Sequence, residues 1–138
     1  MALSKTETMA RHPLFKGLRK HDLEFLASNM DEIDVPAGQR LITEGDPNHA
    51  FFVLEEGQVE VTVGGKRRRV MGPGEFFGEI SMDALMKATA TVTTTSPVHA
   101  FVVSHAQFGA LEGNQTVLLH LKEAIADRLE TDRASEQR

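Results

Sequence analysis

The order of hydrophobic and polar positions divides the chain into a helical start, a block of short strands and a helical end. Apolar residues recur at helical spacing at Leu23, Leu26 and Met30, which predicts a helix over about residues 20–30. A capping-box pattern that opens at Ser4 predicts a shorter helix before it. The N-terminal part is therefore expected to be helical and partly buried against the strands that follow.

Beyond the first helices the apolar period falls to two, which is typical of strands with one buried face. Val59, Val61 and Val63 show this most clearly, because Glu60 and Thr62 separate them. Clusters of turn residues divide the region into short runs about 8 to 12 residues apart, as in β-sandwiches and small barrels. The predicted strands include residues 33–35, 41–42, 50–54, 59–63, 89–95 and 98–103.

Helical patterns return at the C-terminal end. Ser104 and Gln107 form a second capping box, which predicts a short helix to about Leu111. A longer amphipathic helix is expected over residues 115–132. Its apolar face consists of Leu118, Leu121, Ile125 and Leu129. Such a helix depends on packing for its stability, so it docks on its own barrel, on a partner, or on each in turn.

Composition limits the class of protein. A chain of 138 residues can bury a core of its own, and no apolar run approaches the roughly 20 residues that cross a bilayer. The first residues lack the apolar segment of a secretory signal, and the absence of cysteine excludes disulfides and thiolate chemistry. A net charge of −5 argues against a non-specific nucleic-acid binder. We therefore expect a cytoplasmic protein with no membrane segment and no nucleic-acid partner.

One basic cluster, Lys66–Arg69, follows directly after Gly64 and Gly65. The glycine pair predicts a tight hairpin, so the main interpretation is a hairpin tip that carries solvated charges. The alternative interpretation is a contact point for an acidic partner.

The candidate chemistry lies in residues 74–92. Gly74 and Gly78 bracket two phenylalanines, and Glu79 follows directly. A glycine-bracketed turn that presents one acid and a row of backbone N–H groups is suited to a small ligand that is both anionic and hydroxylated.

This stretch, together with residues 36–46 and 52–59, resembles the cyclic nucleotide-binding domain family, which includes sensor domains of the catabolite activator and of cAMP-dependent protein kinase regulatory subunits. The resemblance extends from about Pro13 to Leu129. It implies a mainly β fold, an eight-stranded jelly-roll barrel flanked by N-terminal helices and a C-terminal helix pair. The expected single domain, residues 1–138, comprises N-terminal helices (1–30), a β-roll (31–103) with a phosphate-binding cassette (74–92), C-terminal helices (104–132) and a tail (133–138).

In this family the cassette opens with Phe-Gly-Glu, and Phe77, Gly78 and Glu79 match that opening. The resemblance implies that Glu79 accepts a hydrogen bond from the ribose 2′-hydroxyl. It also implies that the backbone N–H groups of Gly78, Ile80 and Ser81 face the cyclic phosphate, at a helix start that attracts anions.

The family also has an arginine ten positions after the cassette glycine, and this chain has Ala88 there. Ala90, with the Thr and Val that follow it, matches the close of the cassette and fixes this register, while Thr89 matches a position that can contact phosphate or purine. Loss of a bidentate arginine–phosphate pair costs roughly 3–5 kcal/mol, or about two to four decades in affinity. Lys87 is adjacent, but a shift of one residue along a strand sends a side chain to the opposite face.

Four functions are compatible with these residues. The first is a non-catalytic regulatory domain with a degenerate phosphate site and weak or no binding of cAMP or cGMP, acting through its last helix. The second is a genuine cAMP or cGMP sensor that uses Lys87 and backbone N–H groups. The third is an interaction domain that binds a partner, or a second copy, through residues 115–132. The fourth, a cupin-like metalloenzyme, is disfavoured because the six histidines include no closely spaced pair, so we expect no catalytic residue, no metal and no cofactor.

Overall fold

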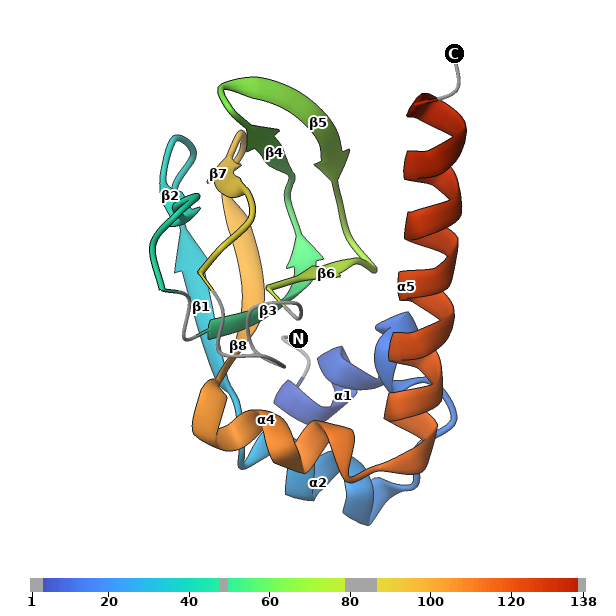
Figure 1. Ribbon diagram of the computed structural model, residues 1–138. Helices are drawn as coiled ribbons and strands as arrows, with labels where there is room; N and C mark the ends of the chain where they lie inside the picture. The colour runs from blue at the N-terminus through green and yellow to red at the C-terminus, as the bar shows by residue number, and fades with distance from the viewer. Residues whose placement is uncertain (1–3, 48–49, 79–86, 137–138) are drawn as a thin grey trace.

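Two facing β-sheets, with helices over one of them, make up the fold (Figure 1). A computed structural model describes residues 4–47, 50–78 and 87–136, with side chains as far as Arg128. The helices are α1 (Lys5–Ala10), η1 (Pro13–Phe15), α2 (Lys20–Ala27), α4 (His105–Glu112) and α5 (Gln115–Glu136). The strands are β1 (Asp31–Val35), β2 (Arg40–Ile42), β3 (Ala50–Glu56), β4 (Val59–Val63), β5 (Lys66–Met71), β6 (Phe76–Phe77), β7 (Thr91–Thr94) and β8 (Val98–Ser104).

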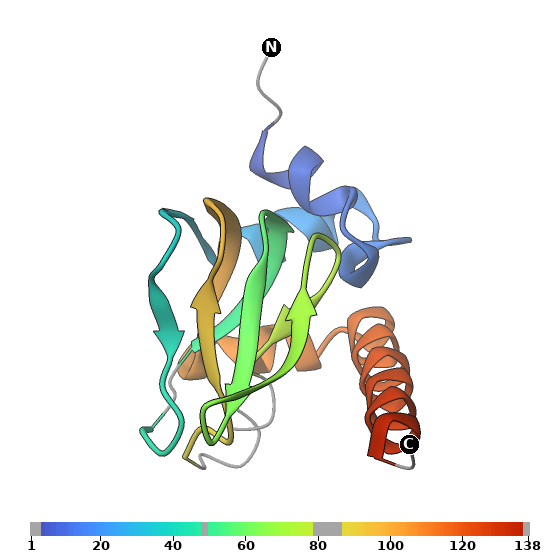
Figure 2. The ribbon, with the colours of Figure 1, turned by 90° about the horizontal axis from the view of Figure 1, so that it is seen from above.

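The strands are antiparallel throughout the described part of the chain. The first sheet has the order β1-β8-β3-β6, and the second has the order β2-β7-β4-β5. Apart from the hairpin β4–β5 within the second sheet, consecutive strands therefore alternate between sheets in the manner of a jelly roll, and this confirms the expected mainly β fold with its flanking helices. Figure 2, seen from above, shows that β5 is the strand of the second sheet nearest to α5.

Strand β3 is buried on both faces, because the first sheet lies between the helices and the second sheet. Phe51 and Val53 face the helices, whereas Phe52 and Leu54 face the second sheet. This alternation divides the core into two clusters. We call the first the helix-side cluster, and its members from the sheet are Phe51, Val53, Phe76, Phe101 and Val103. We call the second the inner cluster, and it consists of Ile42, Phe52, Leu54, Val59, Met71, Phe77, Ala88, Val92, Val98 and Ala100.

Local signals in the sequence set the helix ends. Ser4 caps α1 by accepting a hydrogen bond from the Glu7 N–H, and Ser104 forms the predicted capping box with Gln107 at the start of α4. The Lys5 ammonium donates to the carbonyl of Ala27, the last residue of α2, and to that of Met30, just before β1. The first helix is in this way attached to the second at the point where the chain enters β1.

The structure corrects three expected boundaries. Lys66–Arg69 are not a hairpin tip but part of β5, because Gly64 and Gly65 alone make the turn and Lys66 already pairs with Val63. Strand β7 begins at Thr91 rather than at residue 89, since the chain before it pairs with a neighbouring turn instead. Helix α5 continues to Glu136, four residues beyond the predicted end at 132.

Among the residues that the structure describes, no helix has both the length and the apolar character needed to cross a membrane.

Two turn glycines allow a matched test of how tightly the strands are packed. Gly57 and Gly38 both have positive φ, 92° and 85°, but a Cβ at Gly57 would lie 2.1 Å from the Pro97 carbonyl oxygen, whereas nothing lies within 4 Å at Gly38. We expect Gly38→Ala to destabilise the protein by about 1 kcal/mol through backbone strain alone. Gly57→Ala should cost at least about 2 kcal/mol more, measured by urea unfolding. Equal losses would contradict the close approach of the β3–β4 turn to β8.

Candidate functional site

The short strand β6 brings the chain to the start of the cassette. Its two side chains point to opposite faces of the sheet: Phe76 contacts Phe51 in the helix-side cluster, and Phe77 stacks on Phe52 in the inner cluster with a centroid distance of 4.9 Å. Gly78 follows with φ of 99°, a conformation that glycine adopts without strain. The Phe-Phe-Gly sequence therefore ends the strand and turns the chain at a fixed point.

Three of the expected ligand contacts, Glu79, Ile80 and Ser81, lie outside the described residues. Phe77 and Gly78 are described and lie at the end of β6, where the resemblance places the opening of the cassette. The description resumes at Lys87, in the segment that closes it.

At the closing segment the structure separates Lys87 from Ala88. The Ala88 methyl group is buried, 6% exposed, in the inner cluster, whereas Lys87 is exposed and bridges to Pro47. Consecutive residues in extended chain point to opposite sides, as expected. The inner cluster therefore contains a methyl group, and not the ammonium of Lys87, at the position where the resemblance places the family's arginine.

The backbone at Ala88 is already paired on both sides. Its N–H donates to the Asp46 carbonyl at 2.8 Å, and its carbonyl accepts from the Gly45 N–H at 2.9 Å. Glu44, in the same turn, accepts from the Gly64 N–H at 3.0 Å and donates its own N–H to the Thr91 hydroxyl at 2.9 Å. The turn between β2 and β3 thus holds the backbone at position 88 in place.

Thr89 and Ala90 are the other expected contacts, and they form a bend between position 88 and β7. Thr89 is exposed and Ala90 is half-buried. Within the part of the chain that the structure describes, neither backbone N–H makes a hydrogen bond. These two N–H groups differ in this respect from the N–H of Ala88, which donates to the Asp46 carbonyl.

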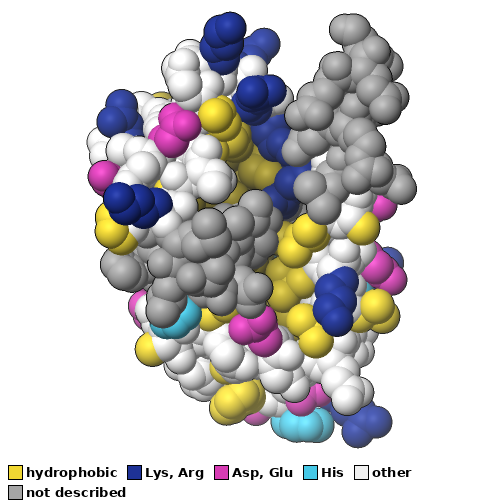
Figure 3. Space-filling view, viewed as in Figure 1, with side chains coloured by type: hydrophobic (Ala, Val, Ile, Leu, Met, Phe, Trp, Pro, Cys, Tyr) yellow, Lys and Arg dark blue, Asp and Glu magenta, His cyan; other side chains and the backbone are white. Residues whose placement is uncertain are grey.

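The second sheet forms the opposite wall of the roll. Val59, Val61 and Val92 are buried or half-buried on its inner side, and Val61 pairs directly with Arg69 of β5. Arg69 therefore shares the inner face with Val61, and it is half-buried. Figure 3 shows an apolar hollow between this sheet and α5, with Lys and Arg side chains at the wall toward α5.

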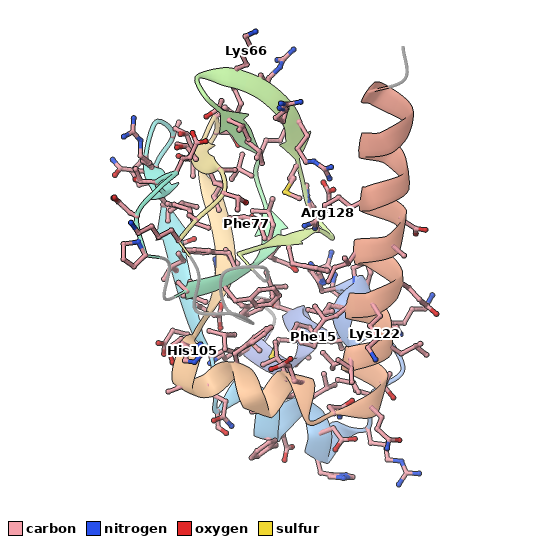
Figure 4. All side chains as sticks on the ribbon, viewed as in Figure 1. Phe15, Lys66, Phe77, His105, Lys122 and Arg128 are labelled. Carbon is pink, nitrogen blue, oxygen red and sulfur yellow. The ribbon has the colours of Figure 1, made fainter. Side chains whose placement is uncertain are left out.

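Helix α5 contacts the cassette strand through Arg128 (Figure 4). The guanidinium donates to the Phe76 carbonyl oxygen at 2.7 Å, and its central carbon lies 5.0 Å from the centroid of the Phe76 ring. Nearer the start of α5, His120 donates from Nδ1 to the Leu14 carbonyl oxygen at 2.9 Å. The helix is thereby attached both to η1 and to the strand that leads into Gly78.

A buried histidine attaches η1 to the same strand. His12 accepts the Leu14 N–H at Nδ1 and lies with Nε2 3.3 Å from the Glu75 carbonyl oxygen, which makes Nε2–H the donor. Burial lowers the pKa of His12 from 6.5 to about 4, although the backbone hydrogen bonds at Glu75 and Leu54 act in the opposite direction. His12 is therefore neutral at pH 7 and joins the N-terminal segment to the residue before β6.

Sequence reasoning missed His12, Arg69 and Arg128. The alternation along β5 contained a signal for Arg69, because it lies two positions before the apolar Met71 and should share its face. For Arg128 and His12 no local pattern existed, since both contact residues more than 50 positions away.

A second group of titratable side chains lies on β1 and β8. His99 contacts Asp34 at 2.9 Å through Nδ1 and Glu32 at 3.0 Å through Nε2. Burial lowers the pKa of His99, but the hydrogen bond and charge of Asp34, together with Glu32, outweigh burial and raise it above 6.5. Among the described residues, no group of three His, Asp or Glu side chains could hold a metal ion.

The sequence profile described as cyclic nucleotide-binding domain matches residues 32–113, and the chain belongs to that family. Among curated proteins, it is 36% identical over 72 residues to a cAMP-dependent protein kinase regulatory subunit of Emericella nidulans, a match that covers 51% of this chain and 18% of the subunit. The chain spans less than half of the length of such relatives, between 18% and 44%.

Solved structures agree with the fold. A cAMP-binding acyltransferase from Mycobacterium smegmatis superposes with a TM-score of 0.78 at 28% identity, over 92% of this chain and 41% of that chain. A cyclic nucleotide-binding domain from Methylobacillus flagellatus superposes with a TM-score of 0.79 at 24% identity, over 94% of this chain and 79% of that chain. The family comprises regulatory modules, and the acyltransferase shows that the domain also occurs within an enzyme.

The neutral, buried state of His12 should make stability depend on pH. Because the pKa is about 4 in the folded protein and 6.5 in the unfolded chain, the unfolded chain takes up the proton first as pH falls. The stabilisation is complete above pH 6.5 and is lost progressively toward pH 4, by about 3 kcal/mol in total. Urea unfolding at several pH values between 7 and 4 measures this loss.

The variant His12→Gln keeps an acceptor and a donor but does not titrate, so most of this pH dependence should disappear. His21→Gln, at an exposed position on α2, is the control and should keep the wild-type dependence. The same pH dependence in wild type and His12→Gln would contradict the assignment.

Proposed function

We propose that this member of the cyclic nucleotide-binding domain family is a non-catalytic regulatory domain with a degenerate phosphate site. It binds cAMP and cGMP weakly or not at all, and it acts through α5. The observation that carries the proposal is the buried methyl group of Ala88 in the inner cluster, where the family has an arginine. The charge and the lack of cysteine support a cytoplasmic location without direct contact to nucleic acid.

The loss at position 88 is large enough to decide the function. A bidentate guanidinium supplies two charge-assisted hydrogen bonds, each contributing about 1.5–3 kcal/mol. Phe77, Gly78, Glu79, Ile80 and Ser81 could still form the ribose side of the site, and Thr89 and Ala90 could still offer their N–H groups. Without the arginine, a micromolar site becomes roughly a millimolar one.

The alternative sensor, with Lys87 in place of the arginine, has less support. Lys87 is exposed, on the opposite side of the backbone from Ala88. Moving its ammonium into the roll would require breaking the pairs of Ala88 with Gly45 and Asp46.

Helix α5 is the element that we propose transmits the state of the domain. It contacts η1 through His120 and β6 through Arg128, so it can sense a displacement of either. Leu119, on the same helix, is 54% exposed and supports a protein partner or a second copy as the target of residues 115–132.

Calorimetric titration with cAMP and cGMP to millimolar concentration tests the degenerate site. The wild-type protein should show a dissociation constant near or above about 1 mM. Ala88→Arg should bind about two to four decades more tightly, because it restores the bidentate contact. Ala88→Met adds length without charge and should not bind more tightly than wild type. Micromolar binding by the wild type would refute the proposal, and no gain in Ala88→Arg would show that the missing arginine is not the cause.

The attachment of α5 can be tested independently of any ligand. Arg128→Ala removes a charged hydrogen bond and a cation–π contact, which together contribute about 1–3 kcal/mol. We expect amide hydrogen exchange in α5 beyond Leu121 to accelerate by about tenfold or more, with little change in β3 and β8. Lys122→Ala, at an exposed position on the same helix, is the control. Equal exchange in the two variants would contradict the role of Arg128 as the anchor.

A further inference from the structure

The inner wall of the second sheet carries a positive charge among the apolar side chains of Val59, Val61 and Met71. Arg69 pairs with Val61 across the β4–β5 hairpin, and Val61 in turn pairs with Val92 of β7. Val59 pairs with Met71, and both belong to the inner cluster. Because residues directly opposite in antiparallel strands share a face, Arg69 lies on the inner side of the roll.

This placement depends on an irregularity in the hairpin. The register between β4 and β5 shifts between Val61 and Thr62, where Val61 pairs with Arg69 and Thr62 with Arg67. The extra residue is Arg68, which is exposed. A bulge of this kind redirects neighbouring side chains, so two adjacent arginines differ in environment.

Arg128 approaches the same edge of the roll from α5. Figures 1 and 2 agree that β5 is the strand beside α5, and Figure 3 shows basic side chains along the wall of the hollow toward that helix. The hydrogen bond to Phe76 uses one of the five N–H groups of the Arg128 guanidinium. Both arginines already have contacts within the protein, so an entering anion exchanges contacts with them.

We propose that the roll contains a second anion site, on the wall opposite position 88, in which Arg69 binds the phosphate of an organic phosphate monoester and Arg128 completes the contact at the α5 edge. This second site rests on the proposed function in one respect only: both take the interior of the roll as the place where a ligand binds. The two differ in the position of the charged side chain, which is Arg69 rather than residue 88, and in the ligand, which is a phosphate monoester rather than a cyclic nucleotide.

The chemistry of the wall favours a monoester over a cyclic diester. A terminal phosphate carries a charge of about −1.5 to −2 and three acceptor oxygens, which match two guanidinium forks. A cyclic diester has a single charge and no terminal group that could reach the rim. Beside Arg69, the half-buried Val61 offers an apolar contact to the body attached to that phosphate.

The test uses 1-naphthyl phosphate as the anionic probe and 1-naphthol as the uncharged one, titrated into the full chain by calorimetry. The wild type should bind the phosphate at least about tenfold more tightly than the naphthol. Arg69→Gln should lose about tenfold or more, and Arg69→Lys should retain part of the affinity because it keeps the charge but not the fork. Arg68→Gln, with the same change of charge at the exposed neighbour, should remain within about twofold of wild type.

A direct readout separates ligand contact from a structural role. Addition of 1-naphthyl phosphate should shift the side-chain Nε–H resonance of Arg69 in an NMR spectrum and leave that of Arg68 in place. Failure of the wild type to bind, or equal losses in Arg69→Gln and Arg68→Gln, would overturn the inference. An unshifted Arg69 resonance with binding intact would overturn it as well. Each of these results leaves the cAMP titrations of Ala88→Arg unaffected, so the two proposals fail separately.

Discussion

The two-residue strand β6 is the constraint on which the rest of the structure depends. Phe76 belongs to the helix-side cluster and Phe77 to the inner cluster, so this dipeptide, like the longer strands β3 and β8, contributes to both cores. Gly78, with its positive φ, fixes where the chain leaves the sheet. Because both rings are closely packed, neither core can rearrange at β6 without displacing the other.

The packing of the inner cluster also explains why a small residue is tolerated at position 88. An arginine at that position would bring a charge into a cluster of apolar side chains, at a high cost unless an anion accompanies it. The Ala88 methyl group instead completes the packing around Phe77 and Val92.

Much of this architecture could be predicted from local sequence. The capping residues Ser4 and Ser104 marked helix starts, and the alternation of Val59 and Val61 marked a strand with one buried face. Strand β5 is not among the predicted strands, because two glycines suffice for the turn and the bulge at Arg68 cannot be read from a binary pattern. The contact of Arg128 with Phe76 was also beyond reach, since it joins residues that only the complete fold brings together.

The hydrogen bond from Arg128 to the main chain of β6 determines how α5 is attached to the first sheet. Among the described strands, β6 is at the edge of its sheet, so its outer carbonyl faces no strand there, and the Arg128 guanidinium supplies a donor to it. The contact is to the main chain, and therefore it follows the position of the strand rather than the identity of a side chain. The Phe76 carbonyl lies only two residues before Gly78. We therefore expect a displacement of Gly78 to move this carbonyl, which is the acceptor that holds α5. The hydrogen bond from Arg128 therefore attaches α5 to the strand that ends two residues before Glu79, at the start of the expected cassette.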